Sequence, residues 1–121
     1  MARKQFLDGY DMSKGLPMSE AELQSAVIEM AQLFGWLCHH GRASQSKSGR
    51  WSTAVQGDVG FPDLVLARAG EVLFIELKSA NNRLTQPQEC WQAALGALVW
   101  RPEQLRDGTI QKRLRRGGDD G

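Results

Sequence analysis

Two short apolar runs in the middle of the chain constrain its fold more than any other feature of the sequence. They occupy residues 63–67 (Asp-Leu-Val-Leu-Ala) and 72–78 (Val-Leu-Phe-Ile-Glu-Leu-Lys), and Arg-Ala-Gly-Glu separates them. Apolar runs of this length on either side of a tight turn predict a β-hairpin. A turn centred on residues 69–70 pairs Leu66 with Leu73.

The same register brings charged side chains together at the open end of the hairpin. Asp63 lies opposite Glu76, and opposed residues in an antiparallel pair have Cβ atoms about 4.5–5.5 Å apart. Lys78 points to the same face as Glu76 because side chains alternate along a strand. Two carboxylates beside a lysine suit Mg²⁺-assisted cleavage of a phosphodiester. A surface salt bridge between Glu76 and Lys78 is the simpler alternative, and spacing alone leaves both open.

A capping box at Ser19 and Glu22 predicts a helix that ends near Phe34, before Gly35. Its apolar residues follow helical spacing: Leu23, Val27, Met30 and Phe34. Glu20 extends this stripe at its N-terminal end, so we expect its carboxylate at the rim of the core, where a metal site would give it a partner. A favourable charge at the helix N-terminus is the alternative.

The remaining segments complete an α/β domain with a mixed β-sheet flanked by helices. We expect a short strand at 36–39, a mobile loop at 41–60, a helix from Thr85 or Gln86 to Leu95, and a short strand at 98–100. Residues 102–116 are predicted to form a basic, partly helical tail. Within that tail, we expect three arginines to be disordered and to add nonspecific affinity for nucleic acid: Arg113, Arg115 and Arg116.

Length and composition favour one globular domain. The chain has 121 residues, of which 41% are hydrophobic and 24% charged, and this balance excludes wholesale disorder. We expect an N-terminal arm (1–17), a folded domain (18–116) and a flexible tail (117–121). No apolar run approaches the ~18 residues of a membrane helix, and the basic N-terminus lacks the apolar stretch of a signal peptide. These features predict a cytoplasmic protein without a membrane partner.

The predicted loop carries positive charge although the net charge of the chain is only +1. Arg42, Lys47 and Arg50 occur there without an intervening acid, and we expect them to contact phosphates without reading sequence. A solvated loop is the alternative. Trp51 either stacks on an exposed base or anchors the loop against the body of the protein, and the sequence leaves both open.

Several short stretches together resemble a known nuclease family. Pro62-Asp63 followed by Glu76-Leu77-Lys78 resembles the PD-(D/E)XK signature. The other matching stretches are residues 20–24 (Glu-Ala-Glu-Leu-Gln), 60–64 (Gly-Phe-Pro-Asp-Leu), 84–88 (Leu-Thr-Gln-Pro-Gln) and Trp91. With these, the chain is similar to the virus-type replication-repair nuclease (VRR-Nuc) family in its stand-alone phage or bacterial form.

The resemblance implies a restriction-endonuclease-like core and hydrolysis of DNA that depends on Mg²⁺ or Mn²⁺. It implies these site residues: Glu20, Asp63 and Glu76 at the metal, the carbonyl of Leu77 as a further ligand, Lys78 as the catalytic lysine, and Gln88 beside the site. It also implies that His40 and Arg42 contact DNA. Between Trp91 and the Trp-Arg-Pro at 100–102, the chain is shorter than the family pattern, which predicts a truncated second helix or a displaced last strand.

The implied partner is branched DNA, with a four-way junction first, cut by a homodimer without a small-molecule cofactor beyond the metal. The implied location is the cytoplasm of a bacterial cell, or of the host if the protein is phage-encoded. Cleavage of flaps, nicks or duplex without preference is the alternative within enzymes. A noncatalytic DNA-binding module is the alternative from another class of protein.

Overall fold

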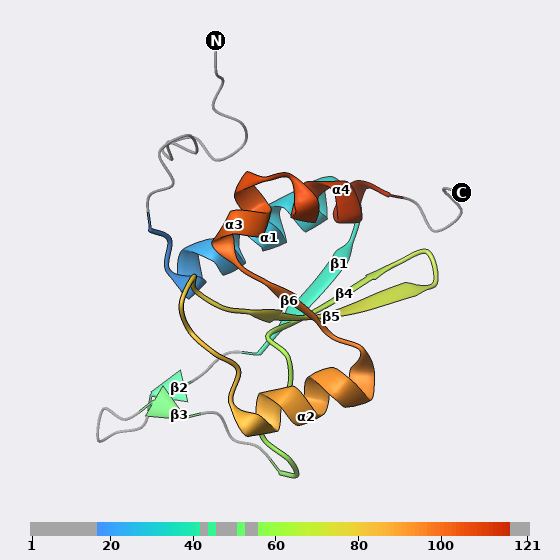
Figure 1. Ribbon diagram of the computed structural model, residues 1–121. Coiled ribbons are helices and arrows are strands. Elements are labelled where there is room, and N and C mark those ends of the chain that lie inside the picture. Colours follow the sequence, from blue (N-terminus) through green and yellow to red (C-terminus); the bar gives the residue numbers. More distant parts are fainter. Residues whose placement is uncertain (1–16, 42–43, 46–50, 53–55, 117–121) are drawn as a thin grey trace.

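The computed structural model describes residues 17–41, 44–45, 51–52 and 56–116. Its helices and strands are α1 (Glu20–Leu33), β1 (Leu37–His40), β2 (Ser44–Gln45), β3 (Trp51–Ser52), β4 (Leu64–Arg68), β5 (Glu71–Leu77), α2 (Gln86–Leu95), β6 (Leu98–Trp100), α3 (Pro102–Arg106) and α4 (Thr109–Arg115) (Figure 1). Within the described ranges, every helix is too short or too polar to cross a bilayer. The predicted arm, except Pro17, and the predicted tail at 117–121 lie outside these ranges.

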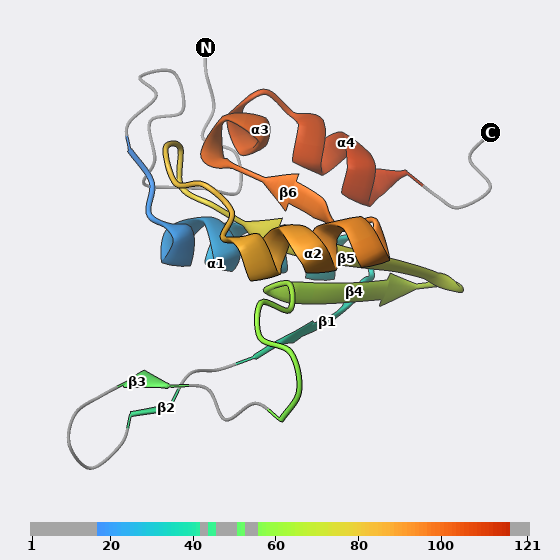
Figure 2. The same cartoon turned by 60° about the horizontal axis from the view of Figure 1, so that its bottom comes forward.

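Four strands form a mixed sheet in the order β1-β4-β5-β6. β1 and β5 pair antiparallel with β4, whereas β6 pairs parallel with β5. Helices α1, α3 and α4 lie on one face of the sheet, and α2 lies on the other (Figures 1 and 2). The predicted α/β architecture with a mixed sheet is confirmed. The short segment after Trp91 still completes an α2 of 10 residues and lets β6 join the sheet.

The hairpin has the predicted register. Leu66 pairs with Leu73, and Arg68 pairs with Glu71 across the turn. Ala69 and Gly70 both have positive φ, 50° and 84°, which a two-residue turn between twisted antiparallel strands requires. This turn sets which residues of β4 and β5 share a face, and therefore which side chains enter the core.

The core lies between the sheet and the layer of α1, α3 and α4. The hairpin contributes the buried side chains Leu64, Leu66, Leu73, Ile75 and Leu77. The predicted stripe of α1 packs against them through Leu23, Val27 and Met30, with Phe34 partly buried at its end. Ser19 caps this helix as expected: its Oγ accepts from the Glu22 N–H at 3.1 Å, and a Glu22 oxygen accepts from the Ser19 N–H at 3.0 Å.

Two predicted segments differ in the structure. The segment 41–60, expected to be one loop, contains the antiparallel pair β2–β3. The prediction that Arg113 and Arg115 belong to a disordered tail was wrong, because both lie in α4. The physical reason is that Ile110 and Leu114 on this helix are fully buried in the core, and this burial offsets the entropy cost of ordering a basic segment.

Arg68 ties the ends of two helices together. Its guanidinium lies 4.3 Å from the ring centre of Trp36 and donates to the carbonyls of Phe34 and Leu114 at 2.9 Å each. It also donates to the Arg116 carbonyl, and the Trp36 indole N–H donates to Leu114 O at 2.8 Å. The last carbonyls of α1 and α4, which have no partner within their helices, therefore share one cation.

We expect Arg68→Ala to lower the free energy of unfolding by about 2 kcal/mol, because hydrogen bonds to a charged donor and a cation–π contact are lost together. Urea denaturation measures this change. Arg115→Ala removes an exposed arginine from the same end of α4 and should change stability by less than about 0.5 kcal/mol. Equal effects of the two substitutions would contradict the role given to Arg68.

Candidate active site

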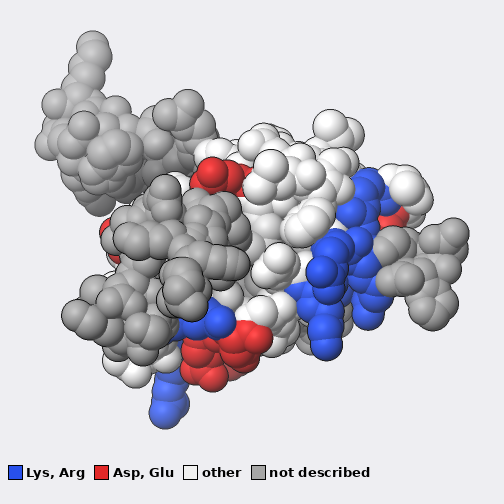
Figure 3. All heavy atoms as spheres, turned by 90° about the horizontal axis from the view of Figure 1, so that it is seen from above, with Lys and Arg blue, Asp and Glu red and all other residues white. Residues whose placement is uncertain are grey.

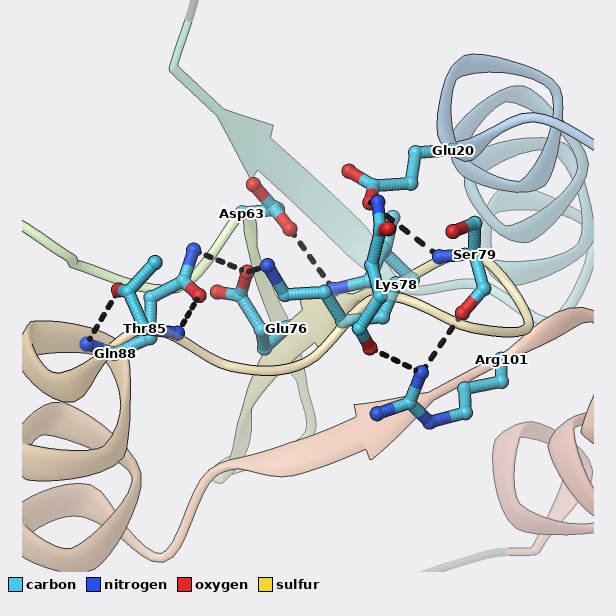
Figure 4. Close-up of polar contacts among 10 residues, drawn as sticks. Glu20, Asp63, Glu76, Lys78, Ser79, Thr85, Gln88 and Arg101 are labelled. Carbon is cyan, nitrogen blue, oxygen red and sulfur yellow. Dashed lines mark hydrogen bonds and ion pairs between the residues drawn. The ribbon is translucent and has the colours of Figure 1, made fainter.

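The open end of the hairpin places Asp63 beside Glu76 on the face that α2 covers. Asp63 lies directly before β4, and its Oδ2 accepts a hydrogen bond of 2.8 Å from the backbone N–H of Leu77 (Figure 4). This bond crosses from one strand to the other, so the hairpin backbone itself orients the carboxylate. The predicted juxtaposition of Asp63 and Glu76 is present in the structure.

Glu76 is buried although it is an acid. The residue is 3% exposed, and Lys78, on the same face, is 7% exposed. One Glu76 oxygen, Oε2, accepts from the Gln88 amide at 2.9 Å and lies 4.0 Å from the Lys78 ammonium. A surface salt bridge, the simpler interpretation of Glu76 and Lys78, does not describe a pair enclosed to this degree.

Burial raises the pKa of Glu76 from its ordinary 4.5 to about 8, and the negative charge of Asp63 adds to the effect. Burial also raises the pKa of Asp63, although the Leu77 N–H opposes this shift. A hydrogen bond between the two carboxyls raises the pKa of Glu76 and lowers that of Asp63, so the proton resides on Glu76. The two carboxylates repel each other, and a positive charge between them relieves this repulsion. Without a metal, a proton supplies that charge.

The capping box of α2 fixes the direction of the Gln88 amide. Gln88 Oε1 accepts from the Thr85 N–H at 2.9 Å, which leaves the amide nitrogen to donate to Glu76. The start of the helix is held in place by a close approach at Gly60, where a Cβ would lie 2.8 Å from the backbone of Pro87. Gly60 also has φ +97°, which favours glycine.

Glu20 lies at the same edge of the sheet, at the start of α1. Its Oε2 accepts from the Ser79 N–H at 3.3 Å and from the Asn82 amide at 3.1 Å. The negative charge of Glu20 contributes to the raised pKa values of Asp63 and Glu76. Its carboxylate therefore acts on the pair from a distance, held by the turn that follows Lys78.

The donor set at this edge fits a hard cation in part. Among the described residues, no three Asp, Glu, His or Cys side chains lie close enough together to hold one metal ion. Asp63 and Glu76 nevertheless form the kind of carboxylate pair that Mg²⁺ uses, since Mg²⁺ takes one or two carboxylates and fills its other positions with water and phosphate. The carbonyl of Leu77 stays a prediction from the resemblance.

The structure describes only part of the residues that were predicted to contact DNA. His40 ends β1 opposite Leu64, and its Nδ1 lies 3.3 Å from the Gly41 carbonyl. Trp51 begins β3, and its side chain is outside the described part of the structure. The other three also lie outside the described residues: Arg42, Lys47 and Arg50. All five stay predictions.

Three residues around Glu20 were not predicted from the sequence: Ser79, Asn82 and Arg101. Arg101 donates to the carbonyls of Ser79 and Asn82, each at 2.7 Å. The only signal available in the sequence was the position of the polar segment 79–82 directly after Lys78. Nothing in the spacing of residues indicated that an arginine about 20 positions later would bind it.

Comparison of this chain with protein-family models, with curated proteins and with solved structures gives no significant match. The assignment of a function therefore depends on the geometry of this edge of the sheet and on the resemblance of its short motifs.

We expect the stability of the metal-free protein to fall as the pH rises from about 4.5 to about 8. The folded state holds a proton on Glu76 over this range, whereas the unfolded state has released it, so each rise in pH favours unfolding. Glu76→Gln, which imitates the protonated acid, should flatten this dependence.

Urea denaturation with chelator at pH 5.5, 7 and 8.5 measures both effects. Glu103→Gln, at an exposed position on α3, is the matched control and should keep the wild-type slope. A wild-type protein whose stability is constant across this range would show that Glu76 titrates normally.

Proposed function

We propose that this chain is a metal-dependent DNA endonuclease with a restriction-endonuclease-like core. The observation that carries the proposal is the half-buried Asp63 beside the buried Glu76, whose Oε2 lies 4.0 Å from the ammonium of the buried Lys78. Burying an acid and a lysine beside a second acid costs stability, and arrangements of this kind concentrate at functional sites. Hydrolysis of a phosphodiester is the chemistry for which two hard oxygen ligands and a neighbouring cation are suited.

When bound, Mg²⁺ or Mn²⁺ neutralises charge on the phosphate and lowers the pKa of a water. Asp63 and Glu76 are the residues that would hold it, with Gln88 keeping Glu76 oriented. Lys78 donates a hydrogen bond to a phosphate oxygen as negative charge builds there. The water oxygen forms its bond to phosphorus and gives up a proton to solvent, while the bond to the leaving sugar oxygen breaks and that oxygen gains a proton from solvent.

A band of basic side chains would attract a polyanionic substrate to the turn end of the hairpin, the end away from the acid pair. Figure 3 shows Lys and Arg side chains gathered in a band along one side of the face that carries α1, α3 and α4. The end of α4 bears four basic residues: Lys112, Arg113, Arg115 and Arg116. Glu71 pairs with Arg113. Nucleic-acid backbones attract such a surface without regard to sequence.

Branched DNA is the substrate that we propose first, with a homodimer cutting a four-way junction. Both parts rest on the resemblance to the stand-alone VRR-Nuc proteins. A twofold-symmetric pair of sites would suit two strands related by the same symmetry. Flaps and linear duplex are the other substrates to compare.

We expect Mg²⁺ or Mn²⁺ to support cleavage of end-labelled DNA and Lys78→Ala to slow it by at least about 100-fold, the usual effect of removing one group that stabilises charge in a transition state. The assay compares a junction, a flap and a linear duplex of shared sequence, each with Mg²⁺, Mn²⁺ or chelator. Gln111→Ala, which removes an exposed neutral side chain from α4, is the control and should leave the rate within a few-fold.

Each outcome has a distinct meaning. Paired symmetric nicks in the junction, absent with chelator and in Lys78→Ala, support a dimeric junction nuclease. Metal-dependent cleavage of the flap or duplex alone would keep the site and reject the junction. Binding of DNA without cleavage of any substrate would reject the enzyme in favour of a DNA-binding module.

A further inference from the structure

The turn at residues 79–82 connects two parts of the molecule that are far apart in sequence. On one side, a single nitrogen of Arg101, Nη1, donates to the carbonyls of Ser79 and Asn82 at 2.7 Å each. On the other side, the Ser79 N–H and the Asn82 amide both donate to Glu20 Oε2. Each of these two turn residues thus accepts from Arg101 and donates to Glu20. Figure 4 shows Ser79 between Glu20 and Arg101.

Arg101 is itself fixed where β6 ends and α3 begins. The preceding carbonyl, Trp100 O, accepts from the Lys78 N–H at 3.1 Å. The Arg101 N–H donates to Gln104 Oε1 at 2.8 Å in the first turn of α3. Arg101 therefore fixes the turn at 79–82 relative to the sheet. This turn begins at Ser79, the residue after Lys78.

The two hydrogen bonds to Glu20 occupy only one of its carboxylate oxygens. Both hydrogen bonds end on Oε2, and within the described residues Oε1 accepts none. The negative charge of Glu20 acts on Asp63 and Glu76. A carboxylate held by one oxygen, with the other oxygen open, increases the attraction of this edge for a divalent cation directly or through a bound water.

We propose that Arg101 is a positioning residue for the cation site. It holds the turn at 79–82 so that Glu20 adds its charge to the pair formed by Asp63 and Glu76. This inference rests on the proposed function, because it assigns a purpose to the turn only if a cation binds there. The competing role is structural: Arg101 would then attach β6 to the turn without affecting the acids.

A double-mutant cycle separates the two roles. Titration calorimetry with Mn²⁺ alone gives the affinity of the wild type, Arg101→Ala, Glu20→Gln and the double variant. Because loss of a residue that orients a ligand weakens metal binding by about 10–100-fold, we expect Arg101→Ala to cost at least about 10-fold in the wild-type background. In the Glu20→Gln background the same change should cost less than about 2-fold.

The controls keep the result interpretable. Arg83→Ala removes an exposed arginine beside the same turn and should leave the Mn²⁺ affinity unchanged. Arg101→Lys retains the charge and a donor, so its Mn²⁺ affinity should lie between those of the wild type and Arg101→Ala. This variant also tests the role of Arg101 if the alanine variant folds poorly. Hydrogen exchange of the Ser79 amide without metal should be about 10-fold faster in Arg101→Ala.

Two failures can be told apart. Equal losses of Mn²⁺ affinity in both backgrounds, or an unchanged exchange rate at Ser79, would overturn the role of Arg101 and leave the nuclease proposal standing. A wild-type protein that binds no Mn²⁺ would overturn the proposed function, and the role of Arg101 with it.

Discussion

The register of the β4–β5 hairpin is the constraint on which the rest of the structure depends. The two-residue turn at Ala69 and Gly70 fixes this register, and alternation along the strands then divides the side chains between two faces. One face supplies the leucines of the core. The other places Glu76 beside Asp63 at the opposite end of the same hairpin. A single local choice of backbone conformation therefore determines both the packing and the acid pair.

The acid pair opposes folding, and several neighbours compensate for it. The Leu77 N–H donates to Asp63, the Gln88 amide and the Lys78 ammonium face Glu76, and a proton on Glu76 removes one charge. Each compensating group belongs to the hairpin or to the first turn of α2. Helix α2 therefore has to begin near Gln86, because only then does the Gln88 amide reach Glu76.

The hairpin register, the starts of the two long helices and the acid pair could be predicted from the sequence because each depends on residues that lie close together in the chain. The turn, the capping boxes at Ser19 and Thr85, and the position of Asp63 opposite Glu76 each depend on residues close in sequence or on strand alternation. The 102–116 segment was predicted to be partly helical, but the burial of α4 was not, because Ile110 and Leu114 are its only strongly apolar residues, too few to reveal a buried face beside four basic residues. The contact of Arg101 with the turn joins residues about 20 positions apart, and no periodicity indicates such a pairing.

Helix α2 differs from the other long helix in how it is held. None of its side chains is buried, whereas α1 buries five. It is attached through Gln88 to Glu76, through the Trp91 indole to the Val59 carbonyl, through an edge-on contact of the Trp91 ring with Phe61, and through the close approach of Pro87 to Gly60. Less apolar surface holds α2 than holds α1, so α2 can open at a lower free energy than the sheet beneath it. Any such opening exposes Glu76 to water, and the chemistry of the acid is thereby linked to the local stability of one helix.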